Sequence, residues 1–116
     1  MLSVTEDDLL RAAREYLERQ GWEVRPVGTR FEAVKAQRRR HIVLRLEPPT
    51  GFAPNVVASS LGLEPTIQVA SPDCYPWFLR VEREIRDRAI PVLFVSVRNE
   101  VVDAWHWPPR QRPRNA

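Results

Sequence analysis

The chain has 116 residues with a formal net charge of +3, and 43% of its residues are hydrophobic while 28% are charged. This balance is typical of one folded domain with a real core and argues against a disordered protein. No apolar run approaches the ~20 residues of a membrane-spanning helix, so the sequence does not favour a membrane protein either. The single cysteine excludes an internal disulfide, the two histidines are too few for a Cys/His zinc site, and the acidic start MLSVTEDDLL is unlike a secretory signal, so we expect a cytoplasmic protein.

The first half of the chain predicts a helix followed by three strands. Thr5 with an acid three residues later has the pattern of a capping box, and apolar residues then recur at helical spacing until Gly21, a left-handed C-cap, so the helix covers residues 6–20. GWEVRPV predicts a short strand that ends near Pro26. RFEAVKA and HIVLRLE predict two more strands, with QRRR between them as the hairpin loop.

The middle of the chain predicts a loop, a brief strand and a long helix. PPTGFAPNVVASSLGLEP is interrupted by proline and glycine, so we expect a connection with at most a short helix over residues 55–61. TIQVAS follows as a possible strand. Ser71 or Asp73 then caps a helix with Pro76 in its first turn. Its apolar stripe has helical spacing and consists of Trp77, Phe78, Val81, Ile85 and Ala89. The lone Cys74 is interpreted as a small buried hydrophobe.

Two strands end the predicted domain. IPVLFVSV is almost continuously apolar, which is typical of a strand buried on both sides of a sheet. VVDAWHW alternates and precedes Pro108 and Pro109, which end the sheet. The order α-β-β-β-(short α)-(β)-α-β-β therefore predicts an α/β domain, α+β in some schemes, with a single mixed β-sheet flanked by helices. We expect this domain over residues 1–109 and a basic, flexible tail over residues 110–116.

The positive charge of the chain is confined to two segments. Residues 25–45 carry seven basic and one acidic residue, and residues 108–116 carry three basic residues and no acid. The other two segments, 1–24 and 46–107, each have a net charge of −3. Clustered arginines of this kind are typical of surfaces that contact phosphates, although a basic loop is also a common solvated feature.

The order of elements resembles the core of the PD-(D/E)XK, or restriction-endonuclease-like, superfamily, in particular its small Holliday-junction-resolvase branch. The resemblance covers residues 5–107 and rests on ERQGWEV after the first helix, on Phe31-Glu32 in RFEAVKA, and on the position of HIVLRLEP. The segment WFLRVEREIRDRAIPVLFVSVRNEVVDAWHW is similar to the family's second helix and closing strands. The resemblance implies a prokaryotic nuclease-like scaffold, which uses two acids to hold magnesium and a lysine to activate water.

The chain departs from the family motif at two of three positions. Glu32 takes the place of the first acid, but Arg45 stands at the second acid and Glu47 stands at the lysine. A migrated active site would need Glu32, Glu47 and Lys35, with help from an acid of the first helix, Glu15 or Glu18, and magnesium as the cofactor. Glu32 and Lys35 are three apart on a strand and so face opposite sides. The simpler interpretation is that both glutamates pair with nearby arginines.

Three functions are compatible with these patterns. The first is a catalytically inactive protein that binds nucleic acid, DNA favoured over RNA, alone or as an accessory subunit of a nucleoprotein complex. Its expected contacts are Arg25, Arg30, Arg38, Arg39, Arg40, Arg110, Arg112 and Arg114. The second is a magnesium-dependent endonuclease or resolvase. The third is a protein-interaction module, a homodimer or an inhibitor, with Trp105 and Trp107 as interface anchors, unless these tryptophans cover the sheet.

Overall fold

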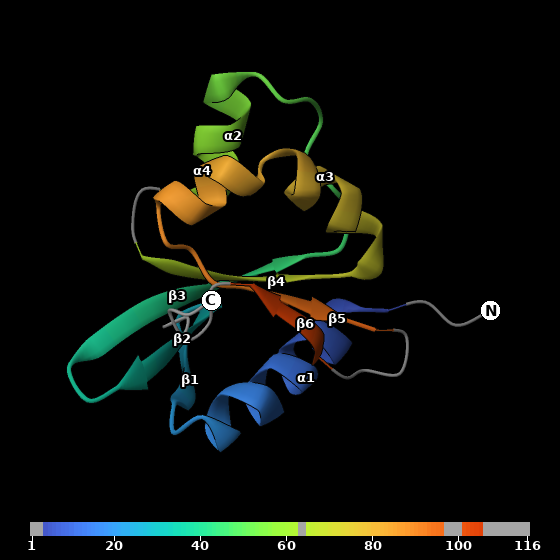
Figure 1. Ribbon diagram of the computed structural model, residues 1–116. Coiled ribbons are helices and arrows are strands. Elements are labelled where there is room, and N and C mark those ends of the chain that lie inside the picture. Colours follow the sequence, from blue (N-terminus) through green and yellow to red (C-terminus); the bar gives the residue numbers. More distant parts are fainter. Residues whose placement is uncertain (1–3, 63–64, 97–100, 106–116) are drawn as a thin grey trace, which may run out of the picture.

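A mixed β-sheet of six strands, in the order β1-β2-β3-β4-β5-β6, forms the centre of the computed structural model (Figure 1). The structure describes residues 4–62, 65–96 and 101–105, the last of these as backbone. Its helices and strands are α1 (Glu6–Arg19), β1 (Glu23–Val27), β2 (Arg30–Lys35), β3 (Arg38–Arg45), α2 (Pro54–Leu61), β4 (Thr66–Ala70), the 3-10 helix η1 (Pro72–Cys74), α3 (Tyr75–Arg80), α4 (Glu82–Asp87), β5 (Val92–Val95) and β6 (Val101–Trp105).

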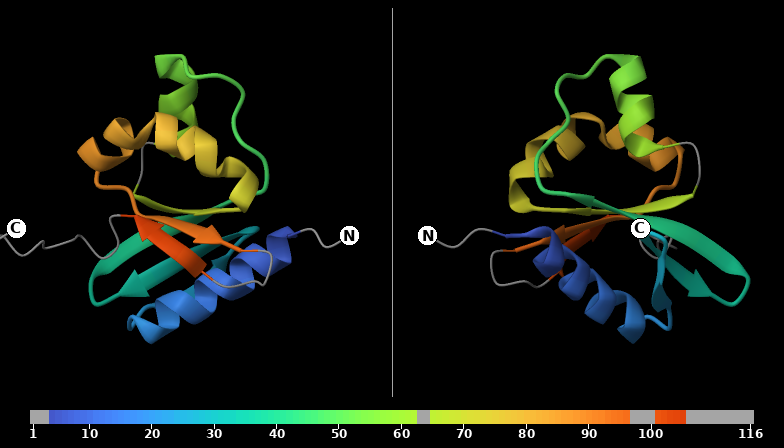
Figure 2. Two further views of the ribbon diagram at one scale, coloured as in Figure 1. Left: turned by 45° about the vertical axis from the view of Figure 1, so that its right-hand side comes forward. Right: turned by 180° about the vertical axis from the view of Figure 1, so that it is seen from behind.

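The sheet has an antiparallel part and a parallel part. Strands β1, β2 and β3 form an antiparallel meander, β3, β4 and β5 are mutually parallel, and β6 returns antiparallel to β5. Helix α1 covers one face, and α2, α3 and α4 cover the other, as Figures 1 and 2 show from three sides. The prediction of a single mixed sheet flanked by helices is therefore confirmed. No helix in the described part of the chain is long and apolar enough to cross a membrane.

Helix α1 begins and ends where its sequence signals place it. The Thr5 hydroxyl accepts from the Asp8 N–H at 3.2 Å, and the Asp8 carboxylate accepts from the Thr5 N–H at 3.0 Å, which completes the capping box. Gly21 has a φ of +93°, and the paired hydrogen bonds Gly21 N to Glu18 O and Trp22 N to Leu17 O form a Schellman motif. Since Leu17 and Trp22 are both buried, this end also anchors the helix to the core.

Two apolar clusters fill the space on either side of the sheet. The cluster on the α1 side contains residues of α1, of the loop after it and of all strands from β1 to β5. The cluster on the other side joins α2, η1, α3 and α4 to the sheet, and within it Phe78 packs edge-to-face against Phe94 and Trp77. Strands β4 and β5 are buried along their whole length because they lie between these clusters.

The segment predicted as one long helix is broken into three. Residues 72–74 form η1, and α3 ends before Val81, whose φ of −108° and ψ of 22° are not helical. The apolar residues on either side of the break still share one face, because Phe78 on α3 and Ile85 on α4 pack in the same buried cluster. The prediction of a continuous helix to Ala89 is therefore wrong, because tertiary packing on the twisted sheet outweighs the helical spacing of the apolar residues.

The β2–β3 hairpin is also tighter than predicted. Lys35 pairs directly with Arg38, so the loop contains only Ala36 and Gln37, and the three consecutive arginines belong to β3. Ala36 makes this turn with a φ of +56°. The expected QRRR loop is thus wrong. The predicted strand at VVDAWHW is present as β6, whereas Trp107, the domain boundary at residue 109 and the tail over residues 110–116 lie outside the described residues.

Candidate functional site

A row of polar residues crosses the sheet on the face covered by α2, α3 and α4. Arg25 on β1 lies opposite Glu32 on β2, Glu32 lies opposite His41 on β3, and His41 lies opposite Thr66 on β4. Alternation along the strands explains this placement, because Ala33 and Ile42, the neighbours of Glu32 and His41, point into the cluster under α1. The row places an acid between basic residues of two adjacent strands.

Glu32 is the centre of this row and is almost completely buried. Its Oε2 lies 3.1 Å from Nε of Arg25, and its Oε1 lies 3.6 Å from Nε of Arg39, while the Glu32 side chain is only 6% exposed. Each carboxylate oxygen therefore faces a different arginine. The prediction that Glu32 pairs with nearby arginines is confirmed, and the Arg25–Glu32–Arg39 triad retains a net charge of +1.

The other residues of the predicted catalytic set lie elsewhere. Lys35 is on the opposite face of β2, where its Nζ donates to the Gln20 carbonyl at 2.8 Å, close to the end of α1. Glu47 is exposed beyond the end of β3, about 20 Å from the row at ~3.3 Å per residue. Glu15 and Glu18 are exposed on α1, across the sheet from Glu32. The structure thus does not bring Glu32, Glu47 and Lys35 together.

Arg45 stands where the resemblance places the second acid, and its hydrogen bonds join β3 to β4 and α2. Its Nε donates to Oε1 of Gln68 at 3.2 Å, and its Nη2 donates to the Ser60 carbonyl in the last turn of α2. The Thr66 hydroxyl donates to the neighbouring Leu61 carbonyl at 3.3 Å and accepts from Nε2 of Gln68 at 3.1 Å. Burial lowers the pKa of Arg45. This network satisfies carbonyls that the end of α2 leaves unpaired, and it fixes α2 to the sheet.

The predicted phosphate-binding arginines are only partly brought together. Arg38, Arg39 and Arg40 lie side by side at the start of β3, and Arg25 reaches Arg39 through Glu32. Arg30 is exposed at the other end of β2, about 16 Å from Lys35 by the same strand spacing. Arg110, Arg112 and Arg114 lie outside the described residues, as does the side chain of Trp105.

Lys35 joins this group of arginines, which sequence reasoning did not foresee. Residues 35–40, here called the basic hairpin, place Lys35 directly opposite Arg38 and diagonally opposite Arg40. Burial lowers the pKa of Arg40, whose Nη1 lies 3.4 Å from the Thr66 carbonyl, and the charge of Arg38 lowers that pKa further. Like charges that face each other across a strand pair destabilise it. A correct hairpin register would have revealed this arrangement from the sequence.

Cys74 has no features of a catalytic nucleophile. The residue is fully buried, and burial raises the pKa of its thiol above the ordinary value. The Sγ lies 3.8 Å from the Ser71 hydroxyl and 3.5 Å from the Arg45 carbonyl. Cys74 therefore acts as the small buried residue that its position predicts. Within the ranges that the structure describes, no three His, Cys, Asp or Glu side chains are grouped to hold a metal ion.

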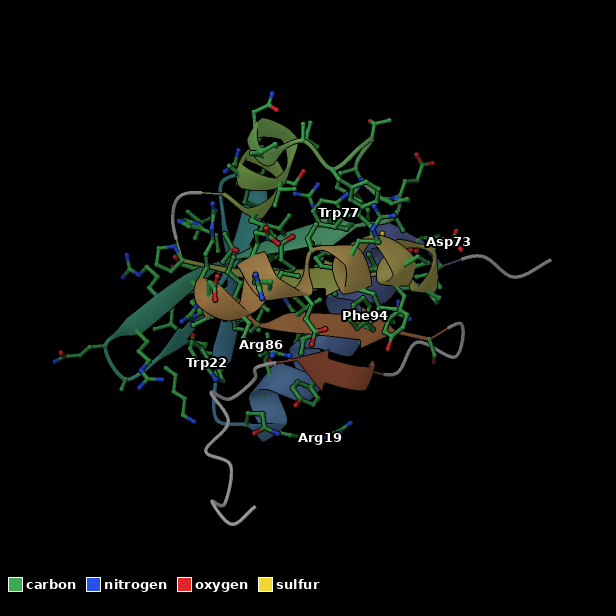
Figure 3. All side chains as sticks on the ribbon, turned by 45° about the horizontal axis from the view of Figure 1, so that its top comes forward. Arg19, Trp22, Asp73, Trp77, Arg86 and Phe94 are labelled. Carbon is green, nitrogen blue, oxygen red and sulfur yellow. The ribbon has the colours of Figure 1, made fainter. Side chains whose placement is uncertain are left out.

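A pair of stacked aromatic residues beside α3, Phe52 and Trp77, was not predicted from the sequence. It borders a hollow of about 520 Å³ between the Pro48–Phe52 segment and α3. Trp77 donates from Nε1 to the Gly51 carbonyl at 2.9 Å, Phe52 stacks 6.4 Å from Trp77, and the Arg80 guanidinium lies 4.2 Å above the Phe52 ring. Figure 3 shows Trp77 and Asp73 on this side of the molecule. The paired prolines and Phe52 in PPTGF are the sequence feature that could have indicated this hollow.

A second hollow, of about 470 Å³, lies between the start of α1 and strands β2 and β3. Its apolar lining comes from Leu10 and from Phe31, Ile42 and Leu44 on the α1 face of the sheet, while Glu6, Asp7 and Arg30 add charges of both signs. The charged groups of this hollow do not match the predicted catalytic residues.

Comparison of the chain with protein-family models, curated proteins and solved structures found no match.

Proposed function

We propose that this protein binds nucleic acid without cleaving it, through the basic hairpin and the adjoining Arg25–Glu32–Arg39 triad. The observation that carries the proposal is the direct pairing of Lys35 with Arg38, with Arg40 diagonal to both. Such pairing of like charges costs folding free energy, although Lys35 also donates a hydrogen bond to the Gln20 carbonyl. A line of phosphates would relieve the repulsion and release counterions on binding.

The state of Glu32 supports binding over catalysis. A catalytic acid needs a free carboxylate oxygen for a metal ion, whereas both oxygens of Glu32 face arginines. Glu32 is the one acid of the 25–45 segment, and because it faces two arginines the triad still carries a net positive charge. A nuclease-like scaffold without its metal-binding acids would suit an accessory subunit that positions a nucleic acid, and the proposal includes this role.

The test is the salt dependence of binding, measured by fluorescence anisotropy with a labelled duplex DNA. We expect binding at ~50 mM salt and a logarithmic loss of affinity with salt, with a slope of about −0.9 for each phosphate contact. The variant Arg38→Ala/Arg39→Ala/Arg40→Ala should make this slope shallower by about two to three. Absence of binding to any nucleic acid at low salt would refute the proposal.

The matched control removes the same charge from other parts of the surface. Arg11 on α1, Arg83 on α4 and Arg88 at the C-cap of α4 are exposed and lie outside the hairpin. The variant Arg11→Ala/Arg83→Ala/Arg88→Ala should therefore keep the slope of the unmodified protein within about one. An equal loss in both triple variants would show that net charge alone is responsible, which contradicts a defined hairpin site.

A further inference from the structure

The basic hairpin carries cations on both of its faces. Lys35 lies on the α1 face, since its Nζ contacts the Gln20 carbonyl at the end of that helix, and alternation places Arg38 and Arg40 on the same face. Arg39 lies on the other face, where its Nε reaches Glu32. A surface that binds one row of phosphates needs cations on one side only. Cations on both faces of the hairpin therefore favour a ligand that presents a row of phosphates to each face.

The end of the basic hairpin has no strand beside it in the described sheet. Pairing between β1 and β2 stops at Glu23 with Val34, and pairing between β3 and β4 begins at His41 with Thr66. Lys35 and Arg38 therefore pair with no strand on either side, and Arg39 and Arg40 have an open edge on the side of β4 only, because their partners Val34 and Ala33 also pair with β1. Figure 1 and the right view of Figure 2 show this end of the hairpin projecting past the ends of α1 and α4. The short tip of Ala36 and Gln37 does not widen it.

Resting on the function proposed above, we infer that the ligand is duplex DNA and that the basic hairpin enters its major groove. The major groove of B-form DNA is about 12 Å wide and admits a two-stranded β-ribbon. Its two walls are phosphate backbones, so Arg39 on one face and Arg38 on the other each meet a row of phosphates. An A-form RNA duplex has a major groove too deep and narrow for side chains to reach, and a single strand has one row of phosphates only.

The first experiment compares nucleic acids with the unmodified protein, so it does not depend on the folding of any variant. Anisotropy is measured with a DNA duplex of about two helical turns, the RNA duplex of the same sequence, and each DNA strand alone. We expect the DNA duplex to bind at least about tenfold more tightly than the RNA duplex or either single strand, a difference of about 1.4 kcal/mol. Equal affinity for duplex RNA or single strands would overturn the inference.

The second experiment blocks one groove at a time. A DNA duplex whose cytosines carry glucosylated hydroxymethyl groups has a filled major groove, and netropsin fills the minor groove of an A·T-rich duplex. We expect the glucosylated duplex to lose at least about tenfold in affinity and netropsin to leave the affinity unchanged. Equal binding to the glucosylated duplex, or competition by netropsin, would overturn the inference.

The third experiment tests the two faces separately. Arg38→Ala and Arg39→Ala each remove one exposed cation from an opposite face, and each should make the salt slope shallower by about one. A change in only one of the two variants would indicate a one-sided contact and overturn the inference. These outcomes leave the proposed function intact, because that function requires only salt-dependent binding through the hairpin, and it fails only when no nucleic acid binds.

Discussion

Nε of Arg25 on β1 lies 3.1 Å from Oε2 of Glu32 on β2, and this contact, with Arg39 on the other carboxylate oxygen, ties three strands together through one buried acid. The two arginines are 42% and 64% exposed, whereas Glu32 is 6% exposed. The acid is therefore the member of the triad that depends most on its partners, because a buried carboxylate without a cation is costly.

Replacement of Glu32 tests how much the triad contributes to stability. Glu32→Gln keeps the shape of the side chain but leaves Arg25 and Arg39 without a counter-charge. We expect a loss of about 1–2 kcal/mol in the free energy of unfolding, below the value for a fully buried pair because solvent screens the arginines. Urea unfolding measures this loss.

The same variant should bind DNA with a steeper salt dependence, by up to about one in slope, because Arg25 loses its counter-charge and becomes available to phosphates. A magnesium-dependent nuclease that used Glu32 would instead lose cleavage and keep its affinity. Weaker DNA binding by a folded Glu32→Gln protein would contradict the assignment of the triad.

The ends of α1 and α4 offer a matched pair of substitutions. Ile90 N donates to Ile85 O and Ala89 N donates to Arg86 O, the same Schellman pattern that ends α1 at Gly21, but the left-handed residue here is an alanine with a φ of +53°. Glycine adopts this conformation without the penalty of ~1–2 kcal/mol that other residues incur. We expect Ala89→Gly to stabilise the protein by up to about 1 kcal/mol.

The reverse change at Gly21 serves as the comparison. A Cβ there would lie 3.4 Å from Cε of Lys35 and would be held at a φ of +93°, so Gly21→Ala should destabilise the protein by about 1–2 kcal/mol. Thermal unfolding should show shifts of several degrees in opposite directions for the two variants. Shifts of the same sign would indicate that α4 does not end in this conformation.

The Arg45 network predicts a non-additive pair of substitutions. Arg45→Met removes the donor to Oε1 of Gln68, a fully buried amide, and also the cation at the end of α2. An unsatisfied buried acceptor costs about 1–3 kcal/mol, so we expect a loss of that size in the free energy of unfolding. Adding Gln68→Leu should recover part of it, because the amide is then absent. Full additivity in the double-mutant cycle would contradict the coupling.

Asp8 should make the free energy of unfolding depend on pH in the acid range. Hydrogen bonds from the Thr5 backbone and hydroxyl lower the pKa of this carboxyl below its ordinary value of 3.8. Since the folded pKa is the lower one, the capping box contributes stability that is fully present above pH ~4 and is lost as the pH falls through the folded pKa. Asp8→Asn should flatten this part of the stability curve, measured by urea unfolding between pH 2 and 6 with Asp7→Asn as the control.

Much of the fold follows from short-range patterns. The capping box at Thr5, the glycine at the end of α1 and the alternation in the strands are local signals, because each depends on residues within one turn or one strand pair. Alternation alone also separates Glu32 from Lys35. The predicted hairpin loop failed because arginines with no strand preference were drawn into β3 by pairing with β2, which outweighs local propensity.

The sequence by itself therefore determined the order of elements, the ends of α1 and the concentration of positive charge in residues 25–45. Only the tertiary structure decided that Arg25 and Arg39 meet on the two oxygens of Glu32, that Lys35 faces Arg38, and that Arg45 turns to α2 rather than to an active site. The physical reason is register and packing: which charges become neighbours depends on how strands far apart along the chain align, and no local pattern encodes that alignment.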